Sequence, residues 1–208
     1  MPVLVAKGAF PLLILVRHGQ TQANSAGLHL GARLDPPLDE TGREQVEVLA
    51  ASGLLAHVKT AVSSPLLRTR QTAEGLGLAY ETDPRWIELD FGDLDGTPVS
   101  AEGPRWTRDP AWAPPGGETL EQLGARVRDA LEELAPRCAQ EDVVVVTHVF
   151  PIKAALAWAL GTEVRTMLRL WITLGSVSRV RIGRQLPVVV SVNEQVPTLD
   201  PRRGAARS

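Results

Sequence analysis

Basic and imidazole side chains follow three apolar runs of this sequence, at the point where each run ends. Arg17 and His18 come directly after "LLILV", His148 comes directly after "VVVVT", and Arg68 comes a few residues after "TAVSS". Two arginines and two imidazoles that meet at one place favour a multiply charged anion, most simply a phosphoryl group. One such residue can arise by chance, so the signal is the repeated position.

The three apolar runs are predicted strands, because they are short and rich in apolar or β-branched residues. They are "PLLILV", "TAVSS" and "DVVVVT", at residues 11–16, 60–64 and 142–147. Helical patterns lie at residues 39–55, 65–77, 116–137, 150–161 and 163–170. Strands that alternate with helices indicate a mostly parallel sheet, whose carboxyl ends share one edge. We expect the polar residues to meet there, with Ser64 and Thr147 as further hydroxyl donors.

Local signals predict where some elements begin and which residues are buried. Thr41, with Glu44 three residues later, is predicted to form a capping box at the start of a helix. The runs "SVSRVRI" and "PVVVSV" have no helix between them and predict a closing hairpin, so one sheet edge is expected to be antiparallel. Trp158 and Trp171 are predicted core residues.

The composition is typical of one globular domain, which we place at residues 1–196. The chain has 208 residues, a net charge of −2, one cysteine and no Cys/His cluster with zinc spacing. No nucleic-acid or membrane partner is indicated, and we expect a cytoplasmic protein, since there is no signal-peptide pattern or long apolar run. The segment around 80–117 is rich in Pro, Gly and Trp and is predicted to be a cap-like insertion, and residues 197–208 a disordered basic tail.

Six sequence blocks in order resemble the histidine phosphatase superfamily, also called the phosphoglycerate mutase-like family, over roughly residues 12–182. The blocks are "LVRHGQTQAN", "DPPLDETGREQV", "SSPLLRTRQTAE", "ELDFGDLDG", "PGGETLEQLGARV" and "VVVVTHVFPIK". The last block, with Val149 where glycine is common, is similar to an acid-phosphatase-like branch. The resemblance implies a three-layer α/β/α fold with a mostly parallel central sheet.

The resemblance also implies a phosphohistidine mechanism. His18 would attack phosphorus through one imidazole nitrogen, while the other nitrogen is expected to bind a backbone carbonyl group that fixes the tautomer. No metal or other cofactor is implied, because arginines would stabilise the phosphoryl charge. The implied phosphate ligands are Arg17, Arg68, His148, Asn24 and, as a weaker candidate that could instead cap its loop, Thr21.

The general acid implied by the resemblance is Glu88, because nearby phosphate oxygens would raise its pKa. Asp90, Asp93 and Asp95 are rivals that we interpret as solvated loop residues.

The sequence leaves several hypotheses for the reaction and the substrate. A phosphatase for a small phosphorylated metabolite is favoured over a cofactor-dependent phosphoglycerate mutase, because Leu89 stands where the mutases resembled have arginine and the segment at 96–115 is short. An α-ribazole-phosphate phosphatase and a non-catalytic binding module remain alternatives. Specificity would come from residues 96–115 and 25–34, which include Arg33. A homodimer is possible, since many relatives are dimers.

Overall fold

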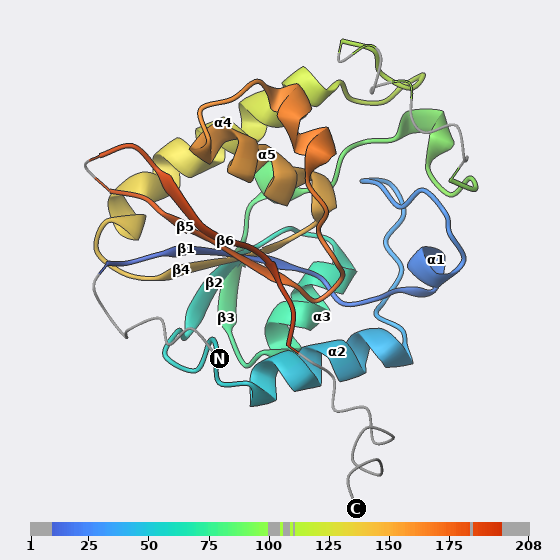
Figure 1. The fold of residues 1–208 in the computed structure, drawn as a ribbon. Helices are drawn as coiled ribbons and strands as arrows, with labels where there is room; N and C mark the ends of the chain where they lie inside the picture. Colours follow the sequence, from blue (N-terminus) through green and yellow to red (C-terminus); the bar gives the residue numbers. More distant parts are fainter. Residues whose placement is uncertain (1–9, 100–104, 106–108, 110, 184, 197–208) are drawn as a thin grey trace, which may run out of the picture.

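A computed structural model describes residues 10–99, 105, 109, 111–183 and 185–196 (Figure 1). A six-stranded sheet lies at its centre, in the order β3-β2-β4-β1-β5-β6. The four strands from β3 to β1 are parallel, β5 is antiparallel to β1, and β6 is antiparallel to β5. The strands are β1 Leu13–Arg17, β2 Thr60–Ser63, β3 Ala79–Thr82, β4 Val143–Thr147, β5 Val177–Arg181 and β6 Val188–Glu194. The predicted mostly parallel sheet with one antiparallel edge is confirmed.

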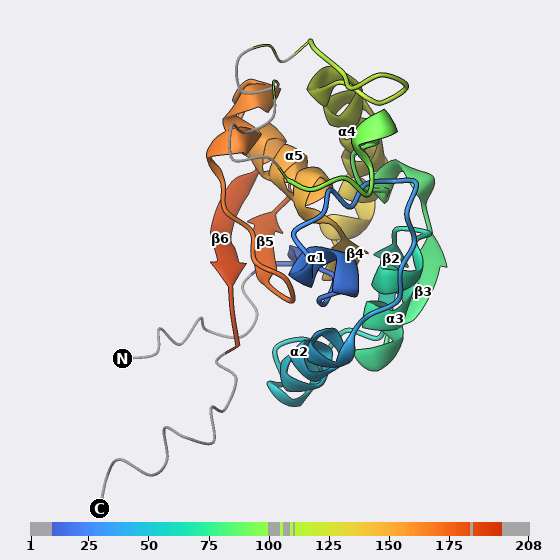
Figure 2. The same ribbon diagram turned by 90° about the vertical axis from the view of Figure 1, so that its right-hand side faces the viewer.

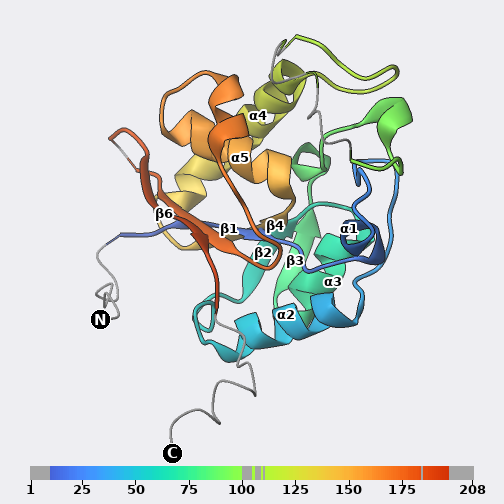
Figure 3. The same ribbon diagram turned by 45° about the vertical axis from the view of Figure 1, so that its right-hand side comes forward.

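Helices cover both faces of the sheet and complete three layers. In Figures 1 and 3, α4 and α5 lie on one face, and α2 and α3 lie on the other. The α-helices are α1 Gln22–Ser25, α2 Glu40–Ala51, α3 Leu67–Gly75, α4 Leu120–Cys138 and α5 Val149–Ala159. The 3₁₀ helices are η1 Pro84–Trp86, η2 Gly92–Leu94 and η4 Val164–Arg169. The predicted three-layer α/β/α fold is confirmed.

Alternate residues of each central strand supply the two sides of the core. In β1, Leu13 and Leu15 pack with α4 and α5, whereas Ile14 and Val16 pack with α2 and α3. Each of these four side chains is at most 1% exposed. A strand that is covered on both faces has no solvent-exposed face for polar residues, and this explains the continuous apolar runs.

The strand register aligns the ends of three strands at one edge. Arg17, the last residue of β1, is opposite Thr147, the last residue of β4, and Ser63 at the end of β2 is opposite Val146. Figure 2 views the molecule from the side at which β1 ends, with α1 in front of the sheet. The residues that follow these strands are therefore brought together.

Several local predictions are wrong. Asp39, not Thr41, caps α2: its carboxylate accepts a hydrogen bond from the Gly42 N–H at 2.8 Å, because the helix begins at Glu40. Trp171 was predicted to be a core residue, but it is 79% exposed. After η4, successive side chains point alternately outward and inward, so its neighbour Ile172 lies in the core instead.

Two further elements differ from the sequence prediction. The segment predicted to be irregular begins with a strand, β3, which pairs with β2 at the sheet edge. The predicted helix at 163–170 is a 3₁₀ helix, Val164–Arg169. Trp158 is half-buried against the core, in agreement with its prediction.

Some predictions fall on residues that the structure does not describe, or on properties that it does not test. The predicted basic tail at 197–208 lies outside the described residues, as do residues 100–104, 106–108 and 110 of the predicted cap. Among the helices of the described part of the chain, none is long and apolar enough to cross a membrane.

Candidate active site

The structure brings five predicted side chains to the carboxyl edge of the sheet. The His18 and His148 rings lie 5.1 Å apart between centroids, at an interplanar angle of 63°. Arg68 Nε donates a hydrogen bond to His148 Nδ1 at 3.2 Å. The charges of Arg17 and Arg68 both act on Glu88. His18, Arg68, Glu88 and His148 are each at most 2% exposed, so these ionisable groups share one environment that excludes bulk water.

His18 is held as a neutral imidazole with a defined tautomer. Its Nδ1 lies 2.7 Å from the carbonyl oxygen of Gly19, which can only accept a hydrogen bond, so Nδ1 carries the proton and Nε2 has a lone pair. Burial lowers the pKa of His18 well below its usual value, and the charges of Arg68 and Arg17 lower it further. The expected carbonyl partner is therefore present, and Nε2 is a potential nucleophile.

His148 has the opposite tautomer. Arg68 Nε–H can only donate, so His148 Nδ1 accepts and Nε2 carries the proton, which it donates to Ser64 Oγ at 2.8 Å. Ser64 Oγ also accepts a long hydrogen bond from the Leu66 N–H at 3.4 Å, which leaves its own hydroxyl proton available to an anion. The pKa of His148 is lowered, mainly by burial and by Arg68. Thr147 was the other expected hydroxyl donor, but its hydroxyl donates to the Trp86 carbonyl at 2.6 Å.

Main-chain carbonyl groups orient the two arginines. Arg68 donates to the carbonyl oxygens of Leu34 and Gly31, each at 2.9 Å, and Arg17 Nη1 donates to that of Ile172 at 2.6 Å. A guanidinium has five N–H groups, so each arginine keeps donors for an anion. Arg17 Nε is buried without a hydrogen-bond partner in the described part of the protein. Burial lowers the pKa of each to about 10, which leaves both charged at neutral pH.

Glu88 lies in an environment that lets its carboxyl group stay protonated at a higher pH than usual. Its Oε1 accepts hydrogen bonds from the backbone N–H groups of Leu89 at 2.8 Å and Phe150 at 3.2 Å. Burial raises the pKa of Glu88, and this outweighs the opposite effect of these bonds and of the two arginines. A buried carboxyl group with a raised pKa, on which the same two arginines act as on His18, suits general acid chemistry.

The rival carboxylates have structural partners. Asp95 accepts hydrogen bonds from the backbone N–H groups of Gly31, Arg33 and Leu34, and Asp90 accepts one from Gly92. These two acids hold the loop whose carbonyl groups bind Arg68. Arg33 forms an ion pair with Asp90 at 2.9 Å and donates a hydrogen bond to the Gly116 carbonyl group, so it links two loops.

Thr21 and Asn24 cap the short helix α1 together. The Thr21 N–H donates to Asn24 Oδ1 at 3.1 Å, and the Asn24 N–H donates to Thr21 Oγ1 at 3.4 Å. Thr21 also donates its hydroxyl proton to Asn24 Oδ1 at 3.0 Å, as expected of a residue that caps its loop. The Asn24 carboxamide nitrogen is the group that could bind an anion, and that role stays a prediction.

Two features near the site were not assigned a role from the sequence. Lys153 is half-buried, with its Nζ 5.6 Å from the centroid of the Phe150 ring. Burial lowers its pKa, which also responds to the charges of Glu88 and Arg17. Its position five residues after His148 in the "THVFPIK" block was the available signal.

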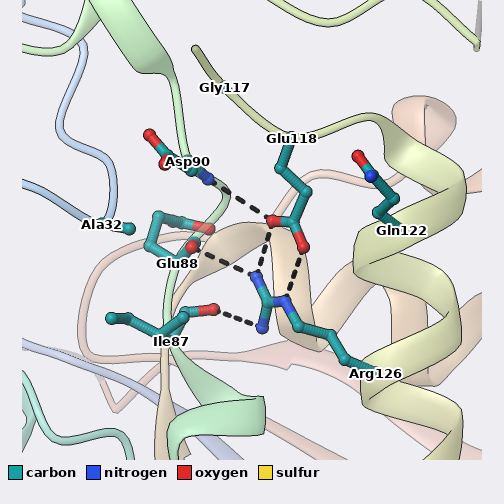
Figure 4. Close-up of a pocket in the computed structure, with 8 residues that line it drawn as sticks. All are labelled: Ala32, Ile87, Glu88, Asp90, Gly117, Glu118, Gln122 and Arg126. Carbon is teal, nitrogen blue, oxygen red and sulfur yellow. Dashed lines mark hydrogen bonds and ion pairs between the residues drawn. The ribbon is translucent and has the colours of Figure 1, made fainter.

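The second feature is a cavity of about 350 Å³ at the backbone of Glu88 (Figure 4). Glu118 and Arg126, which line it, form an ion pair with a distance of 2.7 Å between Arg126 Nε and Glu118 Oε1. Glu118 belongs to the "PGGET" block, but its backbone partners cannot be read from a sequence. Within the described residues, no group of three or more His, Cys, Asp or Glu side chains is placed to hold a metal ion.

Comparison with known proteins identifies relatives of the whole domain. Residues 13–195 match the family model of the histidine phosphatase superfamily, branch 1. Phosphoserine phosphatase 1 of Hydrogenobacter thermophilus is 32% identical over 193 residues, covering 87% of this chain and 91% of that protein. A bifunctional protein of Mycobacterium tuberculosis is 35% identical over 187 residues, covering 83% of this chain and 50% of that protein. The chain thus spans about half the length of several curated relatives that it matches.

A solved structure shares both the fold and part of the sequence. A mycobacterial glucosyl-3-phosphoglycerate phosphatase in complex with VO₃ superimposes with a TM-score of 0.75 and 29% identity, over 89% of this chain and 100% of that one. Proteins named as phosphatases and proteins named as probable phosphoglycerate mutases both occur among the curated relatives.

Proposed function

The chain belongs to the histidine phosphatase superfamily, branch 1, and from that premise we propose that it hydrolyses a small phosphomonoester through a phosphohistidine formed on His18. The observation that carries this proposal is the hydrogen bond from His18 Nδ1 to the Gly19 carbonyl oxygen at 2.7 Å. It leaves Nε2 unprotonated within a cluster of two arginines, a second histidine and a buried carboxyl group. That combination supports nucleophilic attack on a phosphoryl group.

The first step transfers the phosphoryl group to the enzyme. His18 Nε2 forms a bond to phosphorus while the bond from phosphorus to the ester oxygen breaks. Glu88 donates its proton to that oxygen, and the product alcohol leaves. Arg17 and Arg68 stabilise the charge on the phosphoryl oxygens, and the Ser64 hydroxyl, oriented by His148, is a further donor.

The second step returns His18 to its starting state. Glu88, now a carboxylate, accepts a proton from a water molecule whose oxygen attacks phosphorus. The bond from Nε2 to phosphorus breaks, inorganic phosphate is released, and Glu88 is again protonated. The order of proton transfers explains why one carboxyl group serves both steps.

The side of the site near Glu88 is where the alcohol part of a substrate would lie. Phe150, whose N–H binds Glu88, is in a row of rings with Phe91, at 5.7 Å, and His29, which is 5.0 Å from Phe91. Lys153 adds a positive charge beside Phe150. An organic phosphate with a second anionic group is compatible with this wall, and the names of relatives suggest phosphoserine and glucosyl-3-phosphoglycerate as first test substrates.

The test is hydrolysis of p-nitrophenyl phosphate by the wild-type chain and by His18→Ala, across acidic to neutral pH and with EDTA present. We expect phosphate release that His18→Ala abolishes, together with an acid-labile, alkali-stable phosphoenzyme in the wild type alone. A parallel assay for 3-phosphoglycerate mutase activity tests the alternative reaction. If the folded wild type released no phosphate from any ester, the hydrolase proposal would be wrong.

A further inference from the structure

Glu118 and Arg126 form an ion pair behind Glu88 that the proposed chemistry does not use directly. We propose that this pair positions the general acid: it holds the backbone on both sides of Glu88, so that the carboxyl group faces the leaving oxygen. This inference rests on the proposed function and adds two positioning residues to it.

Every N–H group of Arg126 has an acceptor, and most acceptors belong to the segment that carries Glu88; Figure 4 shows those of Ile87, Glu88 and Glu118. Nη1 donates to the carbonyl oxygens of Arg85 at 2.6 Å and Ile87 at 2.8 Å. Nη2 donates to the carbonyl oxygen of Glu88 at 3.2 Å. Nε and Nη2 bind the two carboxylate oxygens of Glu118, at 2.7 and 2.9 Å. One planar guanidinium therefore fixes the backbone up to and including Glu88.

Glu118 holds the same segment on the other side of Glu88. Its backbone N–H donates to the Asp90 carbonyl oxygen at 2.9 Å, and its Oε2 accepts a long hydrogen bond from the Asp90 N–H at 3.4 Å. The side chains of Arg126 and Glu118 are only 18% and 16% exposed, so solvent screens this pair weakly. The two residues together bracket Glu88 between Arg85 and Asp90.

The segment needs such partners because it lies outside the sheet. Residues 85–90 run between β3 and η2, beyond the pairing of β3 with β2, and in the described part of the chain no strand supplies N–H groups to their carbonyl oxygens. Arg126 supplies them from α4, a helix of 19 residues packed on the core. Lysine cannot replace it, because a single ammonium nitrogen cannot reach three carbonyl groups and both oxygens of a carboxylate.

A positioning role predicts a dependence on the leaving group that a purely structural role does not. p-Nitrophenolate is a weak base and leaves without a proton, whereas phenolate benefits from one. If the pair acts through Glu88, its loss should slow phenyl phosphate much more than p-nitrophenyl phosphate. If it only supports the fold, both esters should be slowed by the same factor.

The experiment compares kcat/KM of Arg126→Gln and Glu118→Gln for the two esters with that of the wild type. General acid catalysis contributes about 10²–10⁴-fold, so we expect a loss of roughly tenfold or more for phenyl phosphate and at most about threefold for p-nitrophenyl phosphate. Arg137→Gln is the matched control and should leave both rates unchanged, since Arg137 lies on the same helix and forms an ion pair at 2.6 Å with Glu141, just beyond the end of that helix.

A double-mutant cycle identifies the route of the effect. In a Glu88→Gln background, Arg126→Gln should cause no further leaving-group-dependent loss, because the acid on which it acts is absent. Equal losses for both esters, or additive losses in the cycle, would overturn the inference while leaving the hydrolase intact. If Arg126→Gln does not fold, the same comparison with Glu118→Gln decides the question. An inactive but folded wild type would instead contradict the proposed function.

Discussion

His18 and His148 lie in edge-to-face contact, 5.1 Å apart, and carry their protons on opposite nitrogens. The Gly19 carbonyl oxygen places the proton of His18 on Nδ1, and the Arg68 guanidinium places that of His148 on Nε2. Both rings are neutral because burial and the adjacent arginines lower their pKa values. His18 thus presents a lone pair and His148 orients a hydroxyl group, so the two imidazole side chains have different chemical roles.

The pH dependence of the proposed reaction follows from opposite pKa shifts. The pKa of His18 is lowered, so kcat/KM should fall at low pH only below that lowered value. The pKa of Glu88 is raised, so kcat/KM for phenyl phosphate should fall as pH rises through it, because the acid loses its proton. We expect the ratio of wild-type to Glu88→Gln activity to decrease with rising pH. A ratio that is independent of pH would contradict the role of Glu88.

The same raised pKa predicts an effect of Glu88→Gln on stability. A group whose folded-state pKa is raised destabilises the fold once pH exceeds its unfolded pKa, since the folded state then retains a proton that the unfolded state has lost. Glutamine keeps the acceptor for the Leu89 and Phe150 N–H groups without the charge. The melting temperature of Glu88→Gln should therefore rise relative to wild type as pH increases from 4 to 8. A constant difference would show that ionisation of Glu88 has no such cost.

Arg68→Lys should greatly reduce activity although it keeps the positive charge. Lysine keeps the charge but cannot donate at once to His148, Gly31 and Leu34 as the fully buried guanidinium does. We expect kcat/KM to fall about a hundredfold, a usual cost of misplacing groups around a reacting centre. Arg70→Lys on the same helix is the control, because Arg70 interacts with Tyr80. Equal effects of the two changes would refute the specific role of Arg68.

The sequence was sufficient to predict how the principal site residues meet. Arg17 ends a strand buried on both faces, His18 and His148 each follow such a strand, and Arg68 lies in the first turn of the helix that follows β2. Parallel pairing then brings them together whatever the details of the loops. The apolar runs that mark these strands are a direct consequence of burial on both faces, which is why this part of the prediction succeeded.

Features that depend on main-chain acceptors or on long-range packing could not be predicted in this way. Arg126 binds carbonyl oxygens about 40 residues earlier in the chain, and a carbonyl group has no sequence signature. Thr41 carries a good capping pattern, but the residue that caps the helix is Asp39, two residues earlier. Trp171 is exposed because side chains after η4 point alternately toward solvent and toward the core. The hydrophobicity of Trp171 does not reveal on which side it lies.

Inorganic phosphate, the proposed product, should stabilise the folded protein. Arg17 Nε is buried without a partner, and an anion there would satisfy it and balance two guanidinium charges. At a hundredfold excess over Kd, binding contributes about 2.7 kcal/mol, which corresponds to a rise in melting temperature of roughly 5–10 °C for a domain of this size. Chloride at equal ionic strength is the control. Equal shifts with chloride and phosphate would mean that no specific phosphate site is present.

Gly42 lies against the loop whose Gly19 carbonyl group sets the His18 tautomer. A Cβ atom on Gly42 would lie 2.0 Å from the Gln20 carbonyl oxygen, and one on Gly19 would lie 2.5 Å from the Gly42 carbonyl oxygen, so the loop after β1 and the start of α2 are in direct backbone contact. Gly42→Ala should force this loop away and move the Gly19 carbonyl oxygen from His18 Nδ1. We expect a loss of about 1–3 kcal/mol in the free energy of unfolding, as for overpacked cores.

Activity distinguishes displacement of that carbonyl group from a general loss of stability. In Gly42→Ala, kcat should fall by about tenfold or more at a temperature where the variant is fully folded, because His18 then samples orientations and tautomers that do not present Nε2. Gly183→Ala is the matched control, since a Cβ atom there meets nothing within 4 Å and should change stability by less than about 0.5 kcal/mol. A destabilised Gly42→Ala with wild-type kcat would show that the tautomer of His18 does not depend on this backbone contact, and that Gly19 keeps its place when α2 is pushed away.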